Sequence, residues 1–464
     1  MPDRLRDFRV QLGIVAGVAL TIRVLAVLRW TRFLDPEGDQ NFYWRQGQDL
    51  ADGFGFVYRN SYGERVATAV HPPLYSAYLG AVSFLGGTSH GWHRLASTLL
   101  GVAAVVAIGY AARRIAGNRA GLIAAALAAV YPNLWVNDAM MLSESMYALT
   151  IALVLLTTFR FRDNPSALNV VLLSGSVGLA ALTRAEATLL FVILVVPVVL
   201  LTRTIDVRRR FTLTAVAAVA GALLLAPWVV RNYLTFESNP ITVSNGSGFV
   251  LEIANCDQTY GLAPPLDAAG NPEPGKDADE FLGYWWQGCD RTPWPAGDET
   301  VVEAAKRQTA VAYVGDHTGE LPKVVAARVG RMWDLWRPGQ SYDFNVFFER
   351  RGATPTLAGM VMYYPLLIAS LAGAAVLWRR RVTIIPFVAI AATTTLAAAI
   401  SFGITRYRVG ADVAFTVLAA VALDALWRRL RPSSTRSTDT GAGDDTGQAG
   451  PDADRPSEIA GASR

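Results

Sequence analysis

Long blocks of apolar residues recur along this chain, and they restrict its fold more than any other feature. The first block, VQLGIVAGVALTIRVLAVLRW, runs over residues 10–30 and carries few charges. A stretch of about 18 or more apolar residues is long enough to cross a bilayer. With 52% hydrophobic and 17% charged residues over 464 positions, the chain is too apolar for a soluble protein of its size. We therefore predict an all-α polytopic membrane protein.

The apolar blocks predict ten spanning helices. Because the first block carries Arg23 and lacks a small-residue cleavage site, we expect a retained helix and no cleaved signal peptide. If the helices alternate, the arginine-rich connections, such as those at 113–119 and 379–381, all fall on one side, which predicts that this side and both termini are cytoplasmic. The predicted spans lie near residues 10–30, 92–112, 120–137, 145–160, 167–183, 187–202, 212–230, 356–378, 382–402 and 411–427.

Residues 71–88, HPPLYSAYLGAVSFLGGT, are apolar enough to span but break this alternation if they do. A span there would place the basic connection ARRIAGNRAG outside, against the positive-inside bias. We therefore expect a juxtamembrane or partly embedded helix on the outer face.

The predicted division of the chain follows from these spans. We expect a cytoplasmic N-terminus (1–9), an N-terminal transmembrane catalytic module (10–230) that includes a first outer loop (31–91), an extracytoplasmic loop subdomain (231–355), C-terminal transmembrane helices (356–430) and a disordered cytoplasmic tail (431–464). Both cysteines, Cys256 and Cys289, fall in the loop subdomain. A disulfide is expected if that segment faces an oxidising compartment, and two unpaired thiols are the alternative.

Ionisable residues collect at the outer ends of the predicted helices. Because placing an ionisable side chain in or beside a membrane costs free energy, each of them is a functional candidate. Arginine suits a phosphate because its fork donates two parallel charge-assisted hydrogen bonds, and a carboxylate can remove a proton from an attacking hydroxyl. Arginines and carboxylates that lie together beside a membrane are suited to the transfer of a group from a phospholipid-like donor. The candidates are Asp39, His71, Asp138, Glu144, Arg184, Glu186, Arg231, Arg406 and Arg408.

Each candidate also has a purely structural interpretation. Asp35, Glu37, Asp49 and Asp52 are expected to be solvated loop charges, and Asp49 can pair with Arg45 on a short helix. Arg406 and Arg408 can extend to lipid headgroups, Arg184 can pair locally with Glu186, and His71 can simply start a helix.

Several motifs in order resemble membrane glycosyltransferases of the GT-C fold, in the branch of protein O-mannosyltransferases and lipid A aminoarabinose transferases. The matching segments cover about residues 10 to 430. The segments NCDQTYG and GYWWQGC suggest an actinobacterial subgroup of this branch. The motifs are GDQNFYWRQGQDLADGFGF, HPPLYSAYLGAVSFLGG, RLASTLLGVAAVVAIGYAARRIAGNRAG, MMLSESM, LTRAEA, APWVVRNYLTF and RYR.

The resemblance implies a GT-C-like bundle that transfers a sugar from a polyprenyl-phosphate donor, at the extracytoplasmic face of the cell membrane, with inversion. The acceptor would be a glycan, lipid or protein, and no nucleic-acid partner is expected. By this resemblance Asp39 is the general base, Glu144 corresponds to a second acidic site, and His71 lies near the reacting groups. Asp138 and Glu37 are candidates for additional acidic residues of the site. Arg231, Arg406, Arg408 and Arg184 would hold the lipid phosphate.

The chain departs from the family at two positions. Many relatives carry a second acidic residue after the first-loop aspartate, where this chain has Gln40, and Glu144 stands where several have Asp. A divalent cation needs hard oxygen ligands, so both departures leave metal dependence open. Two other functions remain alternatives: a transporter or flippase of lipid-linked glycans, and a non-catalytic assembly partner that uses 231–355 as a binding surface.

Overall fold

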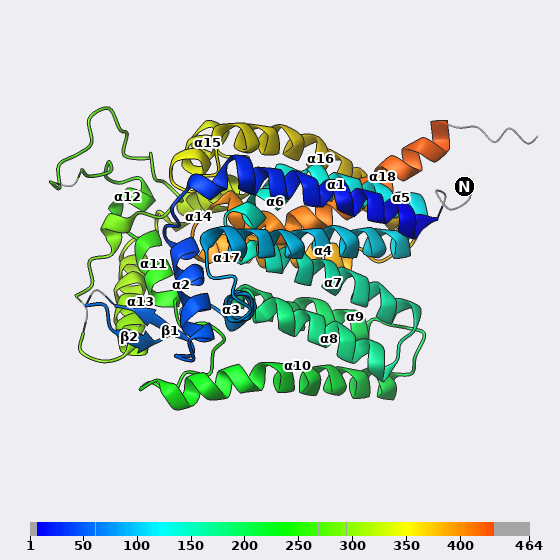
Figure 1. The fold of residues 1–464 in the computed structure, drawn as a ribbon, viewed down its shortest axis with the longest axis horizontal. Coiled ribbons are helices and arrows are strands. Elements are labelled where there is room, and N and C mark those ends of the chain that lie inside the picture. The colour runs from blue at the N-terminus through cyan, green and yellow to red at the C-terminus, as the bar shows by residue number, and fades with distance from the viewer. Residues whose placement is uncertain (1–6, 61, 268, 294, 431–464) are drawn as a thin grey trace, which may run out of the picture.

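The computed structural model describes residues 7–430, apart from positions 61, 268 and 294. Long helices run side by side along the longest axis, and the shorter helices α2 and α11–α13 and the strands gather at one end (Figure 1). Within the described residues, six helices are long and apolar enough to cross a membrane. They are α1 (Phe8–Arg29), α4 (His90–Ala116), α7 (Glu144–Asp163), α10 (Val207–Thr235), α16 (Ala353–Arg379) and α18 (Val409–Leu430).

The other predicted spans are helical but bent or short. The pair α5 (Asn118–Val130) and α6 (Pro132–Ala139) bends by 52° at its break and makes a seventh span if counted as one. Three apolar segments are shorter, so the total of ten spans remains a prediction. These are α8 (Ala167–Ala181), α17 (Ile385–Ile400), and a broken helix made of η3 (Ala185–Thr188), η4 (Phe191–Val195) and α9 (Val196–Leu200).

The last span, α18, lies at the centre of the bundle. In the most apolar 18-residue stretch of this span, 83% of the residues are buried inside the protein, compared with 22% in the corresponding stretches of α1 and α10. Small residues allow neighbouring helices to approach it closely. Gly373 of α16 is one of them, because a Cβ there would meet the Leu418 carbonyl oxygen at 1.9 Å. This packing helps to hold α18 in the bundle, directly after the turn that carries Arg406 and Arg408.

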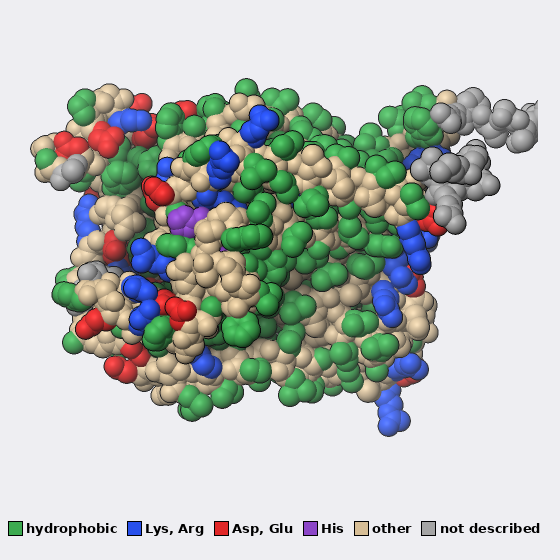
Figure 2. Space-filling model, viewed as in Figure 1, with side chains coloured by type: hydrophobic (Ala, Val, Ile, Leu, Met, Phe, Trp, Pro, Cys, Tyr) green, Lys and Arg blue, Asp and Glu red, His purple; other side chains and the backbone are tan. Residues whose placement is uncertain are grey.

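Charge is distributed unevenly along the bundle. Figure 2 shows hydrophobic side chains over its flank, Lys and Arg at the end near the N-terminus, and charges of both signs at the opposite end. The opposite end holds η2 (Thr31–Phe33), α2 (Asp39–Ala51), the antiparallel pair β1 (Val57–Arg59) and β2 (Arg65–Ala67), and α3 (Pro73–Phe84). Such a flank suits a bilayer, and the chain is a multi-pass membrane protein.

The segment expected to lie along the membrane surface forms the 12-residue helix α3. At 1.5 Å per residue such a helix is about 18 Å long, too short for a hydrocarbon core of about 30 Å. It packs closely on α2, where a Cβ on Gly80 would lie 2.9 Å from the Leu50 Cβ. The segment thus forms a helix too short to cross the bilayer, and its place on the outer face remains a prediction.

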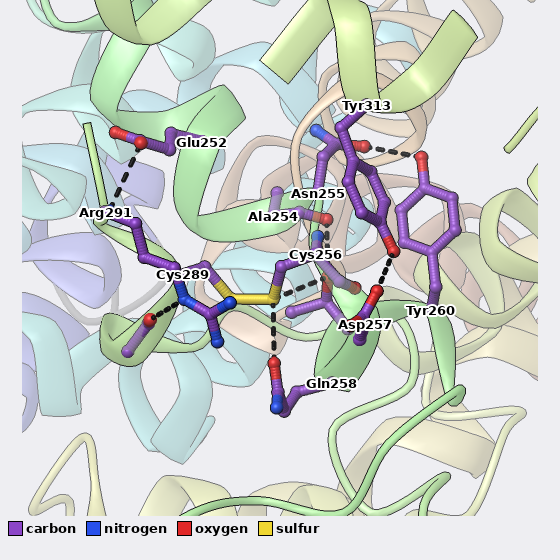
Figure 3. The surroundings of a disulfide bond; sticks show 12 residues. Glu252, Ala254, Asn255, Cys256, Asp257, Gln258, Tyr260, Cys289, Arg291 and Tyr313 are labelled. Carbon is purple, nitrogen blue, oxygen red and sulfur yellow. Dashed lines mark hydrogen bonds between the residues drawn. A yellow bond between two sulfur atoms is a disulfide. The ribbon is translucent and has the colours of Figure 1, made fainter. Parts of the chain in front are cut away.

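Five helices and one 3-10 turn follow α10 and form the large connecting segment. They are α11 (Ser247–Ala254), α12 (Asp257–Tyr260), η5 (Gln287–Cys289), α13 (Glu299–Asp316), α14 (Leu321–Met332) and α15 (Pro338–Phe347). The predicted disulfide joins Cys256 to Cys289, with their Cα atoms 5.8 Å apart (Figure 3). Beside it, the Tyr313 hydroxyl of α13 donates a hydrogen bond to Asp257 at 2.8 Å. The tail predicted to be disordered lies outside the described residues.

Candidate functional site

Arg406 gathers three carboxylates from distant parts of the chain. It lies in η6 (Thr405–Arg408), the turn that leads into α18. Its Nη2 lies 2.7 Å from Asp39 Oδ2, its Nε lies 3.1 Å from Glu144 Oε1, and its Nη1 lies 3.4 Å from Glu349 Oε2. With 15% of its side chain exposed, the guanidinium is largely withdrawn from water. Arg406 therefore joins α2, α7 and the segment after α15 at one point.

The two acidic residues that contact Arg406 and were predicted from the sequence each begin a helix. Asp39 is the first residue of α2, and Glu144 is the first residue of α7. A carboxylate is favoured there because the helix N-terminus carries partial positive charge. Gly38 precedes Asp39 with a φ of 51°, a left-handed conformation that favours glycine. Local sequence thus places each carboxylate at the start of its helix, and the fold brings both to Arg406.

A second arginine, Arg184, continues the charged cluster. Its Nη1 lies 2.6 Å from Glu144 Oε1 and its Nε lies 2.5 Å from Glu186 Oε1. Its guanidinium also lies over the Tyr407 ring, 4.7 Å from the centroid. Glu144, which is buried, consequently bridges two arginines. The predicted local pairing of Arg184 with Glu186 is present, in addition to the contact with Glu144.

His71 lies on the side of Asp39 away from Arg406 Nη2. Its Nε2 is 3.6 Å from Asp39 Oδ1, and its ring packs against Phe42 at 4.8 Å and Tyr43 at 5.2 Å. The side chains of His71 and Asp39 are 27% and 32% exposed, so solvent or a ligand can reach them. Among the paired carboxylates of the cluster, Asp39 is thus the accessible one, while Glu144 is 2% exposed.

The electrostatic environment keeps Asp39 ionised. Burial by itself raises the pKa of this carboxyl, but the Arg406 charge and the neighbouring His71 imidazole outweigh it. The pKa of Asp39 therefore lies well below its ordinary value. Burial and the neighbouring Asp39 charge raise the pKa of Tyr43, which stays neutral.

Two of the predicted phosphate-binding arginines lie elsewhere. Arg408 is fully buried, with Asp334 Oδ2 at 3.0 Å and Asp412 Oδ1 at 3.1 Å. Residues two apart in a 3-10 turn point in different directions, so Arg406 and Arg408 face different partners. Arg231 donates hydrogen bonds to two backbone carbonyls of the segment between α2 and α3, on Phe56 and Thr68, each at 3.0 Å. Their predicted roles in phosphate binding remain untested.

The additional acids also lie outside the Arg406 cluster. Asp138 forms a buried ion pair with Arg23 of α1 at 2.7 Å. Glu37, 69% exposed, pairs with Arg350 at 2.5 Å. Asp49 was expected to be solvated and paired with Arg45, but it is buried and bonds to Arg65 of β2 at 2.8 Å, so that expectation is wrong. The β hairpin brings this cation to α2 from outside the helix.

Glu349 is the member of the cluster that sequence reasoning missed. It follows Phe347 and Phe348 in the stretch FFERRG, where nothing distinguishes its charge from that of a surface residue. Only the fold brings it to Arg406, 57 residues away in the chain. Its side chain is 10% exposed.

The cluster does not resemble a metal site. Its carboxylates point at arginines, and among the described residues no group of three or more His, Cys, Asp or Glu side chains is placed to hold a metal ion. We accordingly assign no chemical step to a metal. The arrangement offers a partly exposed carboxylate, Asp39, between a histidine and Arg406, and Glu144 connects Arg406 to a second arginine, Arg184.

Comparison with known proteins is consistent with this architecture. Residues 70–230 match the family model described as dolichyl-phosphate-mannose-protein mannosyltransferase, and these residues include His71, Glu144 and Arg184. No curated protein matches the chain in sequence.

Among solved structures, the chain is similar to the oligosaccharyltransferase of Archaeoglobus fulgidus. The form tethered to an acceptor peptide has a TM-score of 0.52 and 14% identity over 92% of this chain and 50% of that one. The apo form has a TM-score of 0.50 and 16% identity over 91% and 51%. The chain thus spans about half the length of the oligosaccharyltransferases it matches.

ArnT of Cupriavidus metallidurans bound to undecaprenyl phosphate is a more distant likeness. Its TM-score is 0.43 at 18% identity, over 91% of this chain and 78% of that one. The chain is an all-α multi-pass membrane protein of the GT-C fold, and its residues 70–230 match the dolichyl-phosphate-mannose-protein mannosyltransferase family.

Proposed function

We propose that this protein is a membrane glycosyltransferase that moves a sugar from a polyprenyl-phosphate donor to an acceptor hydroxyl. The observation that carries the proposal is that Arg406 lies between Asp39 and Glu144, with contacts of 2.7 and 3.1 Å. A base for the acceptor and a cation for the phosphate thus stand side by side. The matched family supports the choice of a lipid-phosphate sugar as donor.

The proposed reaction is a direct displacement with inversion. The acceptor hydroxyl gives its proton to the Asp39 carboxylate while its oxygen forms a bond to the sugar C1. The bond between C1 and the phosphate oxygen breaks, and polyprenyl phosphate leaves with the electron pair. Arg406 and Arg184 stabilise the charge that develops on this oxygen, a form of electrostatic stabilisation that often dominates such barriers.

Donor binding would also change the state of Asp39. Without donor, the Arg406 guanidinium is occupied by carboxylates and lowers the pKa of Asp39, which makes Asp39 a weak base. A phosphate that takes the place of Asp39 on Arg406 would neutralise that cation and let the pKa rise. In this scheme the donor itself prepares the base, so that proton removal is efficient only when a sugar is present.

We further propose that the reaction takes place on the extracytoplasmic face. Helix α2, which begins with Asp39, lies toward the end of the bundle opposite the Lys and Arg near the N-terminus (Figures 1 and 2). Basic residues mark the cytoplasmic ends of membrane helices, which supports this orientation. The acceptor, whether glycan, lipid or protein, would then be a component of the cell envelope.

The test incubates membranes containing the protein with isotopically labelled polyprenyl-phosphate sugars and identifies products by mass spectrometry. We expect transfer by the wild type and loss of transfer in Asp39→Asn. Asp52→Asn serves as the matched control, because Asp52 is exposed at the other end of α2. Absence of any transferred sugar with folded wild-type protein across hexosyl and pentosyl donors would overturn the proposal.

A further inference from the structure

The three residues before His71 are held by groups from much later in the chain. The carbonyl of Ala69 accepts a hydrogen bond from the Asn245 N–H at 2.8 Å. The N–H of Ala69 donates to Glu299 Oε1 at 2.6 Å, across 230 residues of sequence. Residues 68–70 have no regular secondary structure, so these contacts replace the partners that a helix or sheet would provide.

The two flanking carbonyls are held in the same way. Arg231 Nη1 donates to the Thr68 carbonyl at 3.0 Å, and Ser244 Oγ donates to the Val70 carbonyl at 2.5 Å. Every backbone carbonyl of residues 68–70 therefore accepts a hydrogen bond from the segment between the end of α10 and the start of α11. This arrangement gives Arg231 a function that its sequence context did not suggest.

Glu299 connects the two segments through a single oxygen atom. Its Oε1 accepts both the Ala69 N–H and the Asn245 Nδ2–H, the latter at 2.9 Å. It is the first residue of α13, a helix capped by the Asp298 side chain. Helix α13 thus fixes the acceptor oxygen on which residue 69 and residue 245 both depend.

The backbone on both sides of His71 is fixed. Before it stand the contacts to residues 68–70, and after it the Leu74 N–H donates to the Leu182 carbonyl at 2.9 Å. A misplacement of about 1 Å in a reacting group can cost about 100-fold in rate. The 3.6 Å separation between His71 Nε2 and Asp39 Oδ1 therefore depends on this anchoring.

We propose that Glu299 is a positioning residue that acts through residues 68–70 to set where the His71 imidazole lies against Asp39. The effect on sugar transfer rests on the proposed function, whereas the placement of the imidazole does not. The competing interpretation is that Glu299 only attaches the connecting segment to the first outer loop. In that case its loss lowers stability and leaves the surroundings of His71 unchanged.

The test uses histidine labelling, because the chain contains only 4 histidines. Imidazole signals of the purified protein in nanodiscs are recorded by NMR, and His71→Asn assigns the signal of interest. The variants are Glu299→Ala, which removes the acceptor, and Glu299→Gln, which keeps an acceptor oxygen. Glu303→Ala is the matched control, since Glu303 lies one turn later on α13 and accepts from the Phe249 N–H at 2.9 Å.

We expect Glu299→Ala to shift the His71 signal alone and to lower kcat by about 10- to 100-fold, with KM changed by less than about threefold. Glu299→Gln should restore both, and Glu303→Ala should leave the His71 signal in place. An unchanged His71 signal in folded Glu299→Ala, or an equal shift in Glu303→Ala, would overturn the inference. A shifted signal in a protein whose wild type transfers no sugar would support the positioning and reject the proposed function.

Discussion

Arg406 Nη2 lies 2.7 Å from Asp39 Oδ2, although 367 residues separate the two in the chain. The contact joins the start of α2 to the turn before the last helix. The Asp39 carboxylate is reachable from solvent, while the arginine behind it is largely buried. The proposed chemistry depends on this pair, because it combines a proton acceptor with a cation for a phosphate.

Replacing Arg406 by lysine should abolish most of the transfer activity. The guanidinium uses three nitrogens to reach three carboxylates, and an ammonium cannot reproduce this planar geometry. We expect kcat/KM to fall by at least about 100-fold, the loss typical of removing one electrostatic donor. Transfer measured in reconstituted membranes tests this, with Arg45→Lys, exposed on α2, as the control. Equal activity in Arg406→Lys would show that the fork is not needed.

Neutralising Glu349 should improve donor binding. Three carboxylates compete with the donor phosphate for Arg406, and removing one charge a few ångströms away changes the interaction by roughly 1 kcal/mol. We therefore expect Glu349→Gln to lower the KM for the donor by about fivefold, since 1.4 kcal/mol corresponds to about tenfold. The KM of Glu273→Gln, a partly exposed glutamate in the connecting segment, should match the wild type. A higher KM in Glu349→Gln would mean that Glu349 helps to hold the donor.

The ion pair of Asp39 should stabilise the protein in a defined pH range. A carboxyl whose folded pKa is lowered contributes stability above its unfolded pKa of about 4 and loses it as pH falls through the folded value. The difference in Tm between wild type and Asp39→Asn should stay constant from about pH 5 to about pH 8 and shrink below about pH 4. Thermal unfolding in detergent measures it. A difference that shrinks between about pH 8 and about pH 6 would indicate a different titrating group.

The disulfide should stabilise the connecting segment. Cys256 and Cys289 are separated by 33 residues, and closing a loop of that size reduces the entropy of the unfolded chain by an equivalent of about 3–4 kcal/mol. The double variant Cys256→Ser/Cys289→Ser should lose about 2–4 kcal/mol of unfolding free energy. Chemical denaturation of the purified protein, with and without reductant, provides the measurement. A wild type insensitive to reductant and a variant of equal stability would contradict the prediction.

Particular residues show what the sequence could and could not predict. Asp39, Glu144 and Arg406 were expected at the outer helix ends, and alternating apolar blocks were enough to bring them to the same end of the bundle. The directions of Arg406 and Arg408 depend on the 3-10 turn η6, which composition does not reveal.

The number of spans and the role of Glu349 illustrate a different limit. Residues 167–181 and 385–400 are as apolar as their neighbours but form helices of 15 and 16 residues, so their depth in the membrane depends on packing. Glu349 reaches Arg406 only because α15 and η6 are placed beside each other by tertiary contacts. Neither fact leaves a periodic or local signal in the sequence.

The central claim is that Asp39 removes the acceptor proton while the arginines hold the donor phosphate. The most direct test is a single-turnover transfer assay on purified Asp39→Asn in nanodiscs, run alongside a binding measurement with polyprenyl phosphate. We predict that the variant still binds the lipid phosphate and transfers at least about 1,000-fold more slowly, within the range for loss of general base catalysis. Transfer at the wild-type rate by folded Asp39→Asn would contradict the account.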